Sequence, residues 1–519
     1  MSSGASETII KNTLFNAAGR FWGILISILL TPYILAHVGV ERYGIWAIVG
    51  VITGYFNLLD FGMGTSYVKY ISEYRAKRDQ EGIDRLVSTG VIVYSAFAVL
   101  VIPAAYLLAP GLLGLFRIPP AFFSEAVFVL RLGVALLVVS NALSVFGAIP
   151  QGLQRMDVSN KIAVGVSLPM VLGTVFFLEK GYGLRGLMLN NAVVLALAGA
   201  ANIFAAFRVL PGLRVGLSRF SGEMFARLFS FGFKMQFSKI AEVLVFQTDR
   251  LLIAYFIDVI SVGLYQLGSS IAQQVRQLPL LLVSAVLPAA SDLDAKNDQD
   301  RLRELYLRGS KYLALASFPV FFFVIAAAGR LMAVWVGPGY ERSAWVLQIL
   351  AVGYLANLLA GVGTSVAAAI GRPEFQMGAA IISAVSNIAL TLALVKPAGF
   401  FGVAAASAVS LILGPLYFFV KLHAKLRLDS GKIAREALLV PLYASALPAA
   451  LLYSVNRWIE PSQGRAGGGA LLLAEGLAFL LVYAAIVLRR NCLDSYDLNL
   501  ARAGLASLLP PGGWWGKRC

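Results

Sequence analysis

The chain has 519 residues, of which 59% are hydrophobic and 13% are charged, and its mean hydropathy is +0.77. These values leave too little polar surface to cover a soluble globule of this size, which excludes an ordinary water-soluble protein. The formal net charge of +16 would suit a nucleic-acid-binding protein, but most of the basic residues lie in alternate loops between long apolar segments, a pattern typical of membrane proteins.

Long apolar segments follow one another along the whole chain. About 20 residues cross the hydrocarbon core as a helix, and a helix satisfies its own backbone hydrogen bonds there, so we predict an all-α polytopic membrane protein with about 14 transmembrane helices. The expected spans are 11–35, 43–68, 87–109, 122–150, 160–178, 186–208, 230–256, 262–289, 311–328, 343–369, 375–395, 400–421, 437–456 and 468–488.

The distribution of Lys and Arg predicts the orientation. The basic segments are 69–85, 208–234, 296–311, 421–435 and the tail from Arg489. Since cytoplasmic loops carry the excess of Lys and Arg, both termini are expected in the cytoplasm. Contacts with anionic membrane lipids then explain the positive charge, and no nucleic-acid partner is expected.

Polar residues share faces of the first helices. In the first span one helix face carries Asn12, Asn16, Arg20, Gly23, Ser27 and Thr31. This face either lines a hydrated cavity or packs closely through its glycines while Arg20 snorkels. In the second span the polar residues are Asn57, Asp60 and, at its cytoplasmic end, Lys69. Arg131 of the fourth span lies about ten residues from the outer end, so snorkelling competes with a cavity role.

The seventh and eighth spans carry most of the remaining charge. Lys239, Glu242, Asp249 and Arg250 lie on roughly one side of the seventh helix. A Lys239–Glu242 ion pair is one structural interpretation, and a pathway role is the other. On the eighth helix one face carries Gln266, Ser269, Gln273, Arg276 and Gln277, with Arg276 near the middle of the bilayer.

Weak internal similarity predicts two repeated lobes. Three local matches recur at offsets of roughly 216–222 residues, among them the turns at Tyr43 and Tyr265. Because six helices precede each recurrence, the lobes should be related by a pseudo-twofold axis along the membrane normal, with a cavity between them. The expected organisation is a six-helix lobe at 1–209, a cytoplasmic linker at 210–229, a second lobe at 230–424, extra helices at 425–489 and a cytoplasmic tail at 490–519.

Several activities lack their sequence patterns. No phosphate-binding loop, metal-ligand cluster or calcium loop is present, and every expected external loop is under about 15 residues, too short for an external catalytic domain. We therefore expect no catalytic residue, metal or cofactor. Glu475 lies outside the repeats, and a local packing or snorkelling role is favoured for it.

Two segments carry a family resemblance. The stretch TPYILAHVGVERYGIWAIVGVITGYFNLLDFGMGTSYVKYISEY (31–74) and the stretch QTDRLLIAYFIDVISVGLYQLGSSI (247–271) resemble the polysaccharide transporter family, Wzx-type flippases of the MATE-like MOP superfamily. The resemblance implies a flippase that passes undecaprenyl-diphosphate-linked oligosaccharides from the inner to the outer leaflet of a bacterial inner membrane. It also implies that Asp60, Lys69, Asp249 and Arg250 are family positions.

The residues support such a role on physical grounds. A diphosphate is matched by guanidinium and ammonium groups inside a low-dielectric cavity, and our candidates for binding it are Arg20, Arg131, Lys239, Arg250 and Arg276. The candidates for polar walls or coupling are Asn57, Asp60, Lys69, Glu242, Asp249, Gln273 and Gln277, with proton or sodium coupling left open. A polysaccharide polymerase and other assembly proteins are candidate partners. The alternatives are a cation-coupled drug or metabolite antiporter of the same superfamily and a membrane glycosyltransferase or polymerase.

Overall fold

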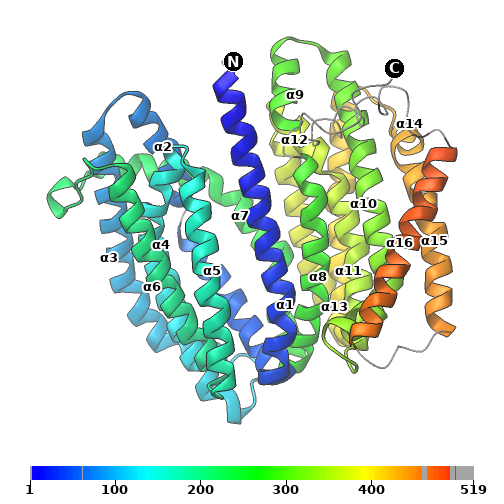
Figure 1. Ribbon diagram of the computed structural model, residues 1–519, viewed down its shortest axis with the longest axis horizontal. Coiled ribbons are helices and arrows are strands. Elements are labelled where there is room, and N and C mark those ends of the chain that lie inside the picture. The colour runs from blue at the N-terminus through cyan, green and yellow to red at the C-terminus, as the bar shows by residue number, and fades with distance from the viewer. Residues whose placement is uncertain are drawn as a thin grey trace, which may run out of the picture. The chain divides into compact units, whose positions relative to one another are not determined.

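The computed structural model describes residues 3–60, 62–283, 286–458, 465–490, 492 and 497, although a few side chains inside these ranges, Arg20 among them, are not described. Over these residues the secondary structure is helical, and no strand occurs in them (Figure 1). Ten of the described helices are long and apolar enough to cross a membrane. The prediction of an all-α polytopic membrane protein is confirmed.

Within the described residues, each expected span falls mainly on helix. The first half contains α1 (Ser3–Phe56), the short 3-10 helix η1 (Asn57–Asp60), α2 (Met63–Ala76), α3 (Gln80–Leu113), α4 (Pro120–Gly152), α5 (Met156–Glu179) and α6 (Gly183–Val209). The second half contains η2 (Leu217–Arg219), α7 (Gly222–Phe256), α8 (Val259–Val283), α9 (Val286–Ala295), α10 (Gln299–Trp335), α11 (Glu341–Leu359), α12 (Gly361–Ala369), α13 (Glu374–Leu426), α14 (Ser430–Ile433), η3 (Ala434–Leu438), α15 (Leu439–Trp458) and α16 (Arg465–Arg489).

Two pairs of expected spans are joined through glycine kinks. Gly39 interrupts α1 with φ 77° and ψ 164°, and Gly399 interrupts α13 with φ 54° and ψ −135°. Positive φ is accessible to glycine at little cost, so the chain turns at these positions without a loop. The first two spans therefore meet at Gly39, and the eleventh and twelfth meet at Gly399.

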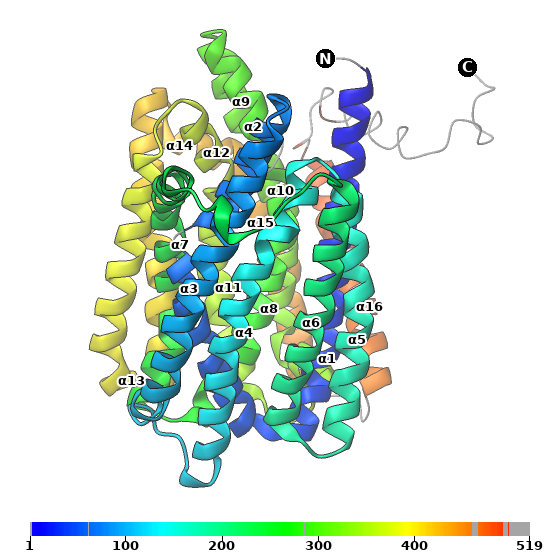
Figure 2. The ribbon, with the colours of Figure 1, turned by 90° about the vertical axis from the view of Figure 1, so that its left-hand side faces the viewer.

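One compact unit consists of residues 1–274, 340–353 and 376–415. Within it, α3, α4, α5 and α6 lie side by side, as both views show (Figure 2). A core of large side chains, including Tyr67, Tyr94 and Ile149, joins α2, α3 and α4. This packing fixes the helices that carry the first half of the candidate site.

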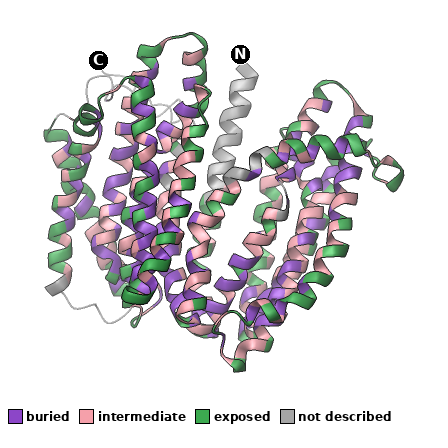
Figure 3. Cartoon of the chain, turned by 180° about the vertical axis from the view of Figure 1, so that it is seen from behind, coloured by how far each residue is buried: buried purple, intermediate pink, exposed green. Residues whose placement is uncertain are grey.

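The other compact unit consists of residues 275–339, 354–375 and 416–519. Its α10, α15 and α16 pack together. On α16, Phe479, Tyr483 and Val487 are buried at four-residue steps, whereas Leu473 and Leu481 are 71% exposed. Figure 3 shows buried and exposed residues alternating along the helices in this way. An apolar helix face exposed in this way is expected to contact lipid, because hydrocarbon is the solvent there.

The division by contacts does not coincide with the predicted lobes at 1–209 and 230–424, and the lobe arrangement stays a prediction. The linker expected at 210–229 is only partly non-helical, because η2 lies within it and α7 begins at Gly222. The N-cap side chain of Ser221 accepts a hydrogen bond from the amide of Met224, which explains why the helix begins earlier than the hydropathy indicates.

Candidate functional site

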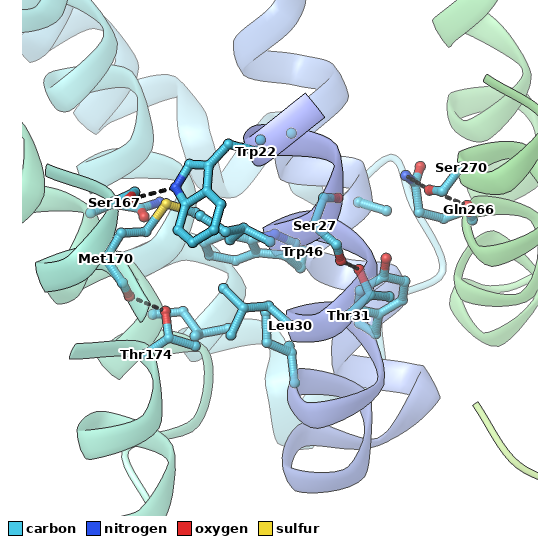
Figure 4. A pocket seen from close by; sticks show the side chains of 18 of the residues that line it. Trp22, Ser27, Leu30, Thr31, Trp46, Ser167, Met170, Thr174, Gln266 and Ser270 are labelled. Carbon is cyan, nitrogen blue, oxygen red and sulfur yellow. Dashed lines mark hydrogen bonds between the residues drawn. The ribbon is translucent and has the colours of Figure 1, made fainter. Parts of the chain in front are cut away.

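A cavity of about 630 Å³ lies within the first unit. Its walls come from α1, α5, α6, α7 and α8, so residues of both predicted lobes line it (Figure 4). The volume is in the range of small-ligand sites. The lining includes Gly23, Ser27, Thr31, Trp22 and Trp46 of α1; Ser167, Met170 and Thr174 of α5; Asn191 of α6; Gln247 and Arg250 of α7; and Gln266 and Ser270 of α8.

The polar face predicted for the first helix lies on this cavity. Gly23, Ser27 and Thr31 all line it, at the expected four-residue steps. The Thr31 hydroxyl donates to the carbonyl oxygen of Ser27 at 2.7 Å, so the helix satisfies this hydroxyl locally. The side chains of Asn12, Asn16 and Arg20 on the same predicted face lie outside the described residues.

Arg250 is the single charged side chain among the described residues that line the cavity. It is 7% exposed, and its Nη2 donates to the hydroxyl of Ser269 at 3.3 Å. Its Nε is buried and has no hydrogen-bond partner. A buried guanidinium that keeps an unused donor is prepared to bind an acceptor, since leaving such a group unpaired costs free energy.

The neighbouring Asp249 is not among the cavity-lining residues and is held inside the protein. Its carboxylate accepts hydrogen bonds from Tyr265 at 2.6 Å, Ser407 at 2.7 Å and Asn387 at 3.0 Å. These donors come from α8 and α13. Asn387 is fully buried, and its amide is used to satisfy Asp249.

Asp60 and Lys239 form an ion pair that the sequence did not predict. Lys239 Nζ lies 3.8 Å from Asp60 Oδ2, and the Tyr94 hydroxyl donates to the other carboxylate oxygen. The Lys239–Glu242 alternative is wrong: Glu242 is exposed, and the ion pair found for Lys239 in the described residues is the one with Asp60. The short helix η1, which carries Asp60, contacts α7, and helical spacing alone could not reveal this.

Three further candidates lie away from the cavity lining. The guanidinium of Arg131 stacks over the ring of Tyr106 at 3.7 Å, and Arg131 Nε donates to the Tyr106 carbonyl oxygen at 3.0 Å. Lys69 is exposed, with its ammonium 4.0 Å from the ring centroid of Phe231. Asn57 is exposed in η1. Cation–π contacts of this kind satisfy the two cations locally.

The eighth-helix candidates divide between the two units. Gln273 belongs to the first unit, whereas Arg276 and Gln277 belong to the second, and all three are half-buried. Their place relative to the cavity stays a prediction. Glu475 of α16 forms a buried ion pair with Arg330 of α10 inside the second unit. This pair agrees with the local packing role favoured for Glu475.

Sequence reasoning missed the uncharged lining residues. The sequence pattern did not indicate Trp22, Trp46, Ser167 or Asn191, because these residues carry no charge. A signal was present on α5, where Ser167, Met170 and Thr174 recur at helical spacing. The Trp22 indole nitrogen donates to the Ser167 hydroxyl at 2.9 Å, which joins α1 to α5 across the cavity wall (Figure 4). No group of three or more metal-ligating side chains occurs in the part of the chain that the structure describes.

Comparisons with known proteins find two matching families. The family described as "Polysaccharide biosynthesis protein" matches residues 9–294, and the family MatE matches residues 235–393. The chain is 22% identical over 422 residues to the putative O-antigen transporter of Shigella flexneri, covering 79% of this chain and 96% of that protein. It is 25% identical over 163 residues to the probable low-salt glycan biosynthesis flippase Agl15 of Haloferax volcanii, covering 31% and 34% of the two chains.

Solved structures share the fold. The lipid II flippase MurJ in an inward closed conformation superposes with a TM-score of 0.69 at 15% identity, covering 93% of this chain and 99% of that chain. A multidrug resistance MATE family transporter of the MOP superfamily, in an inward-facing conformation, gives a TM-score of 0.60 at 16% identity, with coverage of 82% and 96%. At such identities these likenesses establish the fold alone.

Proposed function

Since the chain belongs to the polysaccharide biosynthesis protein family, we propose that it is a flippase that moves a lipid-linked oligosaccharide across a membrane. The similarity to an O-antigen transporter and to a glycan biosynthesis flippase supports this class of substrate. No covalent step is needed for such transport, so the proposal requires no catalytic residue. The polytopic all-α fold supplies the membrane passage.

The observation that carries the proposal is the buried Arg250 in the wall of the 630 Å³ cavity. A lipid-linked oligosaccharide has a diphosphate between its lipid and its sugars, and this group must leave the aqueous headgroup region during transfer. A guanidinium in a low-dielectric cavity stabilises the diphosphate by charge-assisted hydrogen bonds. The amides of Gln247 and Gln266 and the hydroxyl of Ser270 add uncharged polar groups on the same wall.

The finer features of the transport reaction are part of the same proposal. The substrate is undecaprenyl-diphosphate-linked, it moves from the inner to the outer leaflet of a bacterial inner membrane, and both termini are cytoplasmic. Alternating access between two lobes provides the movement. A polysaccharide polymerase and other assembly proteins receive the product. The positive charge of the loops supports the orientation.

Coupling to a proton or sodium gradient is proposed at the two internal carboxylates. Asp60 lies against the cation Lys239, and Asp249 is buried among hydroxyl and amide donors. A buried carboxylate that changes its charge or its partner alters the packing of the helices that hold it.

Arg276 stays a predicted second ligand of the diphosphate.

The test replaces Arg250 in cells that lack their own flippase. We expect Arg250→Ala to lower surface glycan at least about tenfold, because a charge-assisted hydrogen bond contributes roughly 1.5–3 kcal/mol. Arg250→Lys should retain part of the export, since it keeps the charge and loses the fork geometry. Arg131→Ala is the matched control, because Arg131 is also an arginine in a membrane helix but is held on Tyr106. Membrane abundance is measured by immunoblot, and normal export by Arg250→Ala at normal abundance rejects the proposal.

A cation-coupled antiporter is the second candidate, favoured by the MatE match over residues 235–393. Such a protein binds cationic drugs or metabolites and therefore needs acidic groups in its cavity. The described lining residues include Arg250 and no carboxylate, which favours an anionic substrate. If the expressed protein conferred resistance to cationic drugs and did not restore glycan export, the antiporter would be favoured over the flippase.

A further inference from the structure

The walls of the cavity differ in chemistry. The α7 and α8 wall carries Arg250 with Gln247, Gln266 and Ser270, which suits an anion. The wall formed by α1, α5 and α6 carries two indole rings, hydroxyls and an amide, and no charged side chain occurs among its described lining residues. The proposed diphosphate site accounts for the first wall and leaves the second without a ligand.

The two indoles are placed for contact with a ligand. Trp22 is 40% exposed, and the hydrogen bond from its indole nitrogen to Ser167 at 2.9 Å fixes the orientation of the ring at the cavity wall. Trp46, also labelled in Figure 4, lines the same cavity. A flat, apolar aromatic face of fixed orientation contacts the C–H face of a sugar ring at a low entropic cost, since the side chain has few torsions to lose.

A second cavity of about 370 Å³ adjoins the first and is also lined by residues of the first unit. Trp46, Gly50 and Asn191 line both cavities, so they lie at the boundary between them. The second cavity is lined by α1, α4 and α6, and its described lining residues carry no charge. An uncharged ligand extending from the main cavity is therefore accommodated there.

Gly50 leaves free space at this boundary. A Cβ atom added at Gly50 would meet nothing within 4 Å. The absence of a side chain thus leaves free space at the junction, and a larger residue there would extend into it without displacing neighbours. Glycine in a helix interior costs roughly 0.5–1 kcal/mol relative to alanine, so the chain is less stable with glycine here than with alanine.

We propose that Trp22, Trp46 and Asn191 form a binding site for the uncharged sugar rings next to the diphosphate, and that Gly50 determines which glycans enter the adjoining cavity. This inference rests on the proposed function. The indoles stack on the sugar faces, and the amide of Asn191 hydrogen-bonds hydroxyl or acetamido groups. Indole rings stack on many kinds of sugar, so the tryptophans supply affinity for the glycan. The free space at Gly50 selects glycans by their size.

The test compares two purified lipids with the purified, detergent-solubilised full-length protein. One is undecaprenyl diphosphate, and the other is undecaprenyl-diphosphate-linked N-acetylglucosamine. We expect the wild type to bind the sugar-bearing lipid more tightly. Trp46→Leu and Trp22→Leu should weaken that binding by roughly threefold to tenfold each, the size expected for aromatic stacking, and should leave binding of the sugarless lipid unchanged. Trp46→Phe should restore most of the loss, because it keeps an aromatic face.

Two controls separate this inference from the proposed function. Arg250→Ala should weaken the binding of both lipids to the same extent. If the wild type binds neither lipid, or if Arg250→Ala weakens the binding of neither, the proposed function fails. Trp345→Ala, an indole of α11 outside both cavities, should change neither affinity. If the wild type binds both lipids equally, or the Trp22 and Trp46 variants reduce both affinities to the same extent, the sugar site is overturned.

The role of Gly50 is tested in cells with glycans of different size. Gly50→Leu should block export of a branched repeat unit and permit a linear one, with normal membrane abundance. Gly165→Leu on α5 is the matched control, because a Cβ there also meets nothing within 4 Å and Gly165 lines neither cavity. Equal export of both glycans by Gly50→Leu, or equal loss of both, contradicts selection at this position.

Discussion

A close helix crossing provides a quantitative prediction about the transport cycle. Gly263 of α8 packs against Val40 of α1, and a Cβ added at Gly263 would lie 2.5 Å from the Val40 carbonyl oxygen and 3.3 Å from the amide of Gly44. Gly44 in turn packs against the Val259 carbonyl oxygen. The expected topology places this crossing at the external end of both helices.

The perturbation is Gly263→Ala. Real Cβ atoms essentially never approach other heavy atoms within 3.0 Å, so the two backbones must separate by at least about 0.5 Å. Overpacking of this kind costs roughly 1–3 kcal/mol. If the crossing exists only while the external side is closed, the same free energy shifts the equilibrium toward the open state by about 5-fold to 150-fold.

The assay measures access to the cavity from outside. Ser27→Cys on the cavity face of α1 is introduced after replacement of Cys492 and Cys519 by Ser, and intact cells are treated with a membrane-impermeant maleimide. We expect Gly263→Ala to accelerate labelling of the new thiol. Gly165→Ala is the control, because it adds the same methyl group in open space. Unchanged labelling of a stably folded Gly263→Ala protein would refute the reasoning that this crossing opens during transport.

Two other features give predictions for stability. Glu475→Gln leaves the buried guanidinium of Arg330 without its counter-charge. We therefore expect the free energy of unfolding in detergent to fall by about 3–5 kcal/mol. Export per folded molecule should persist, and reduced export would show that α16 takes part in transport. Asp84 anchors the segment with Arg214 and Arg219: it accepts a hydrogen bond from the Arg214 amide at 3.1 Å and lies 3.4 Å from Arg219 Nη1. Asp84→Ala should therefore accelerate tryptic cleavage at these arginines. An unchanged digestion rate would contradict this anchoring role.

The fold could be predicted because its main signal is local. Apolar segments of membrane-spanning length identify helices wherever they occur, and the four-residue spacing of Gly23, Ser27 and Thr31 correctly indicated a cavity-facing side. The kinks at Gly39 and Gly399 were not predicted, since glycine in a membrane helix is also compatible with close packing.

The partners of the internal charges could not be predicted because they come from distant segments. Lys239 and Glu242 are neighbours on one helix, but Lys239 pairs with Asp60, which is 179 residues away in the chain. Asp249 is satisfied by Asn387 and Ser407 of α13. Periodicity places a residue on a face, whereas its partner depends on which helix packs there, and that information is tertiary.

The crossing of α1 and α8 also bears on the predicted repeat. The turns at Tyr43 and Tyr265 match each other in the sequence comparison, with an offset of 222 residues, and they are the segments that meet in the structure. An offset of 222 residues relates Val40 to Val262, and Gly263 to Glu41. The equivalent of the observed contact between Val40 and Gly263 would therefore join Glu41 and Val262, which are their immediate neighbours in the chain. Equivalent segments of two symmetry-related lobes touch each other only where they lie near the axis. The arrangement of the lobes itself stays a prediction. If the lobes are related by the predicted pseudo-twofold, its axis passes close to Gly44 and Gly263, and one methyl group added there would act on both lobes.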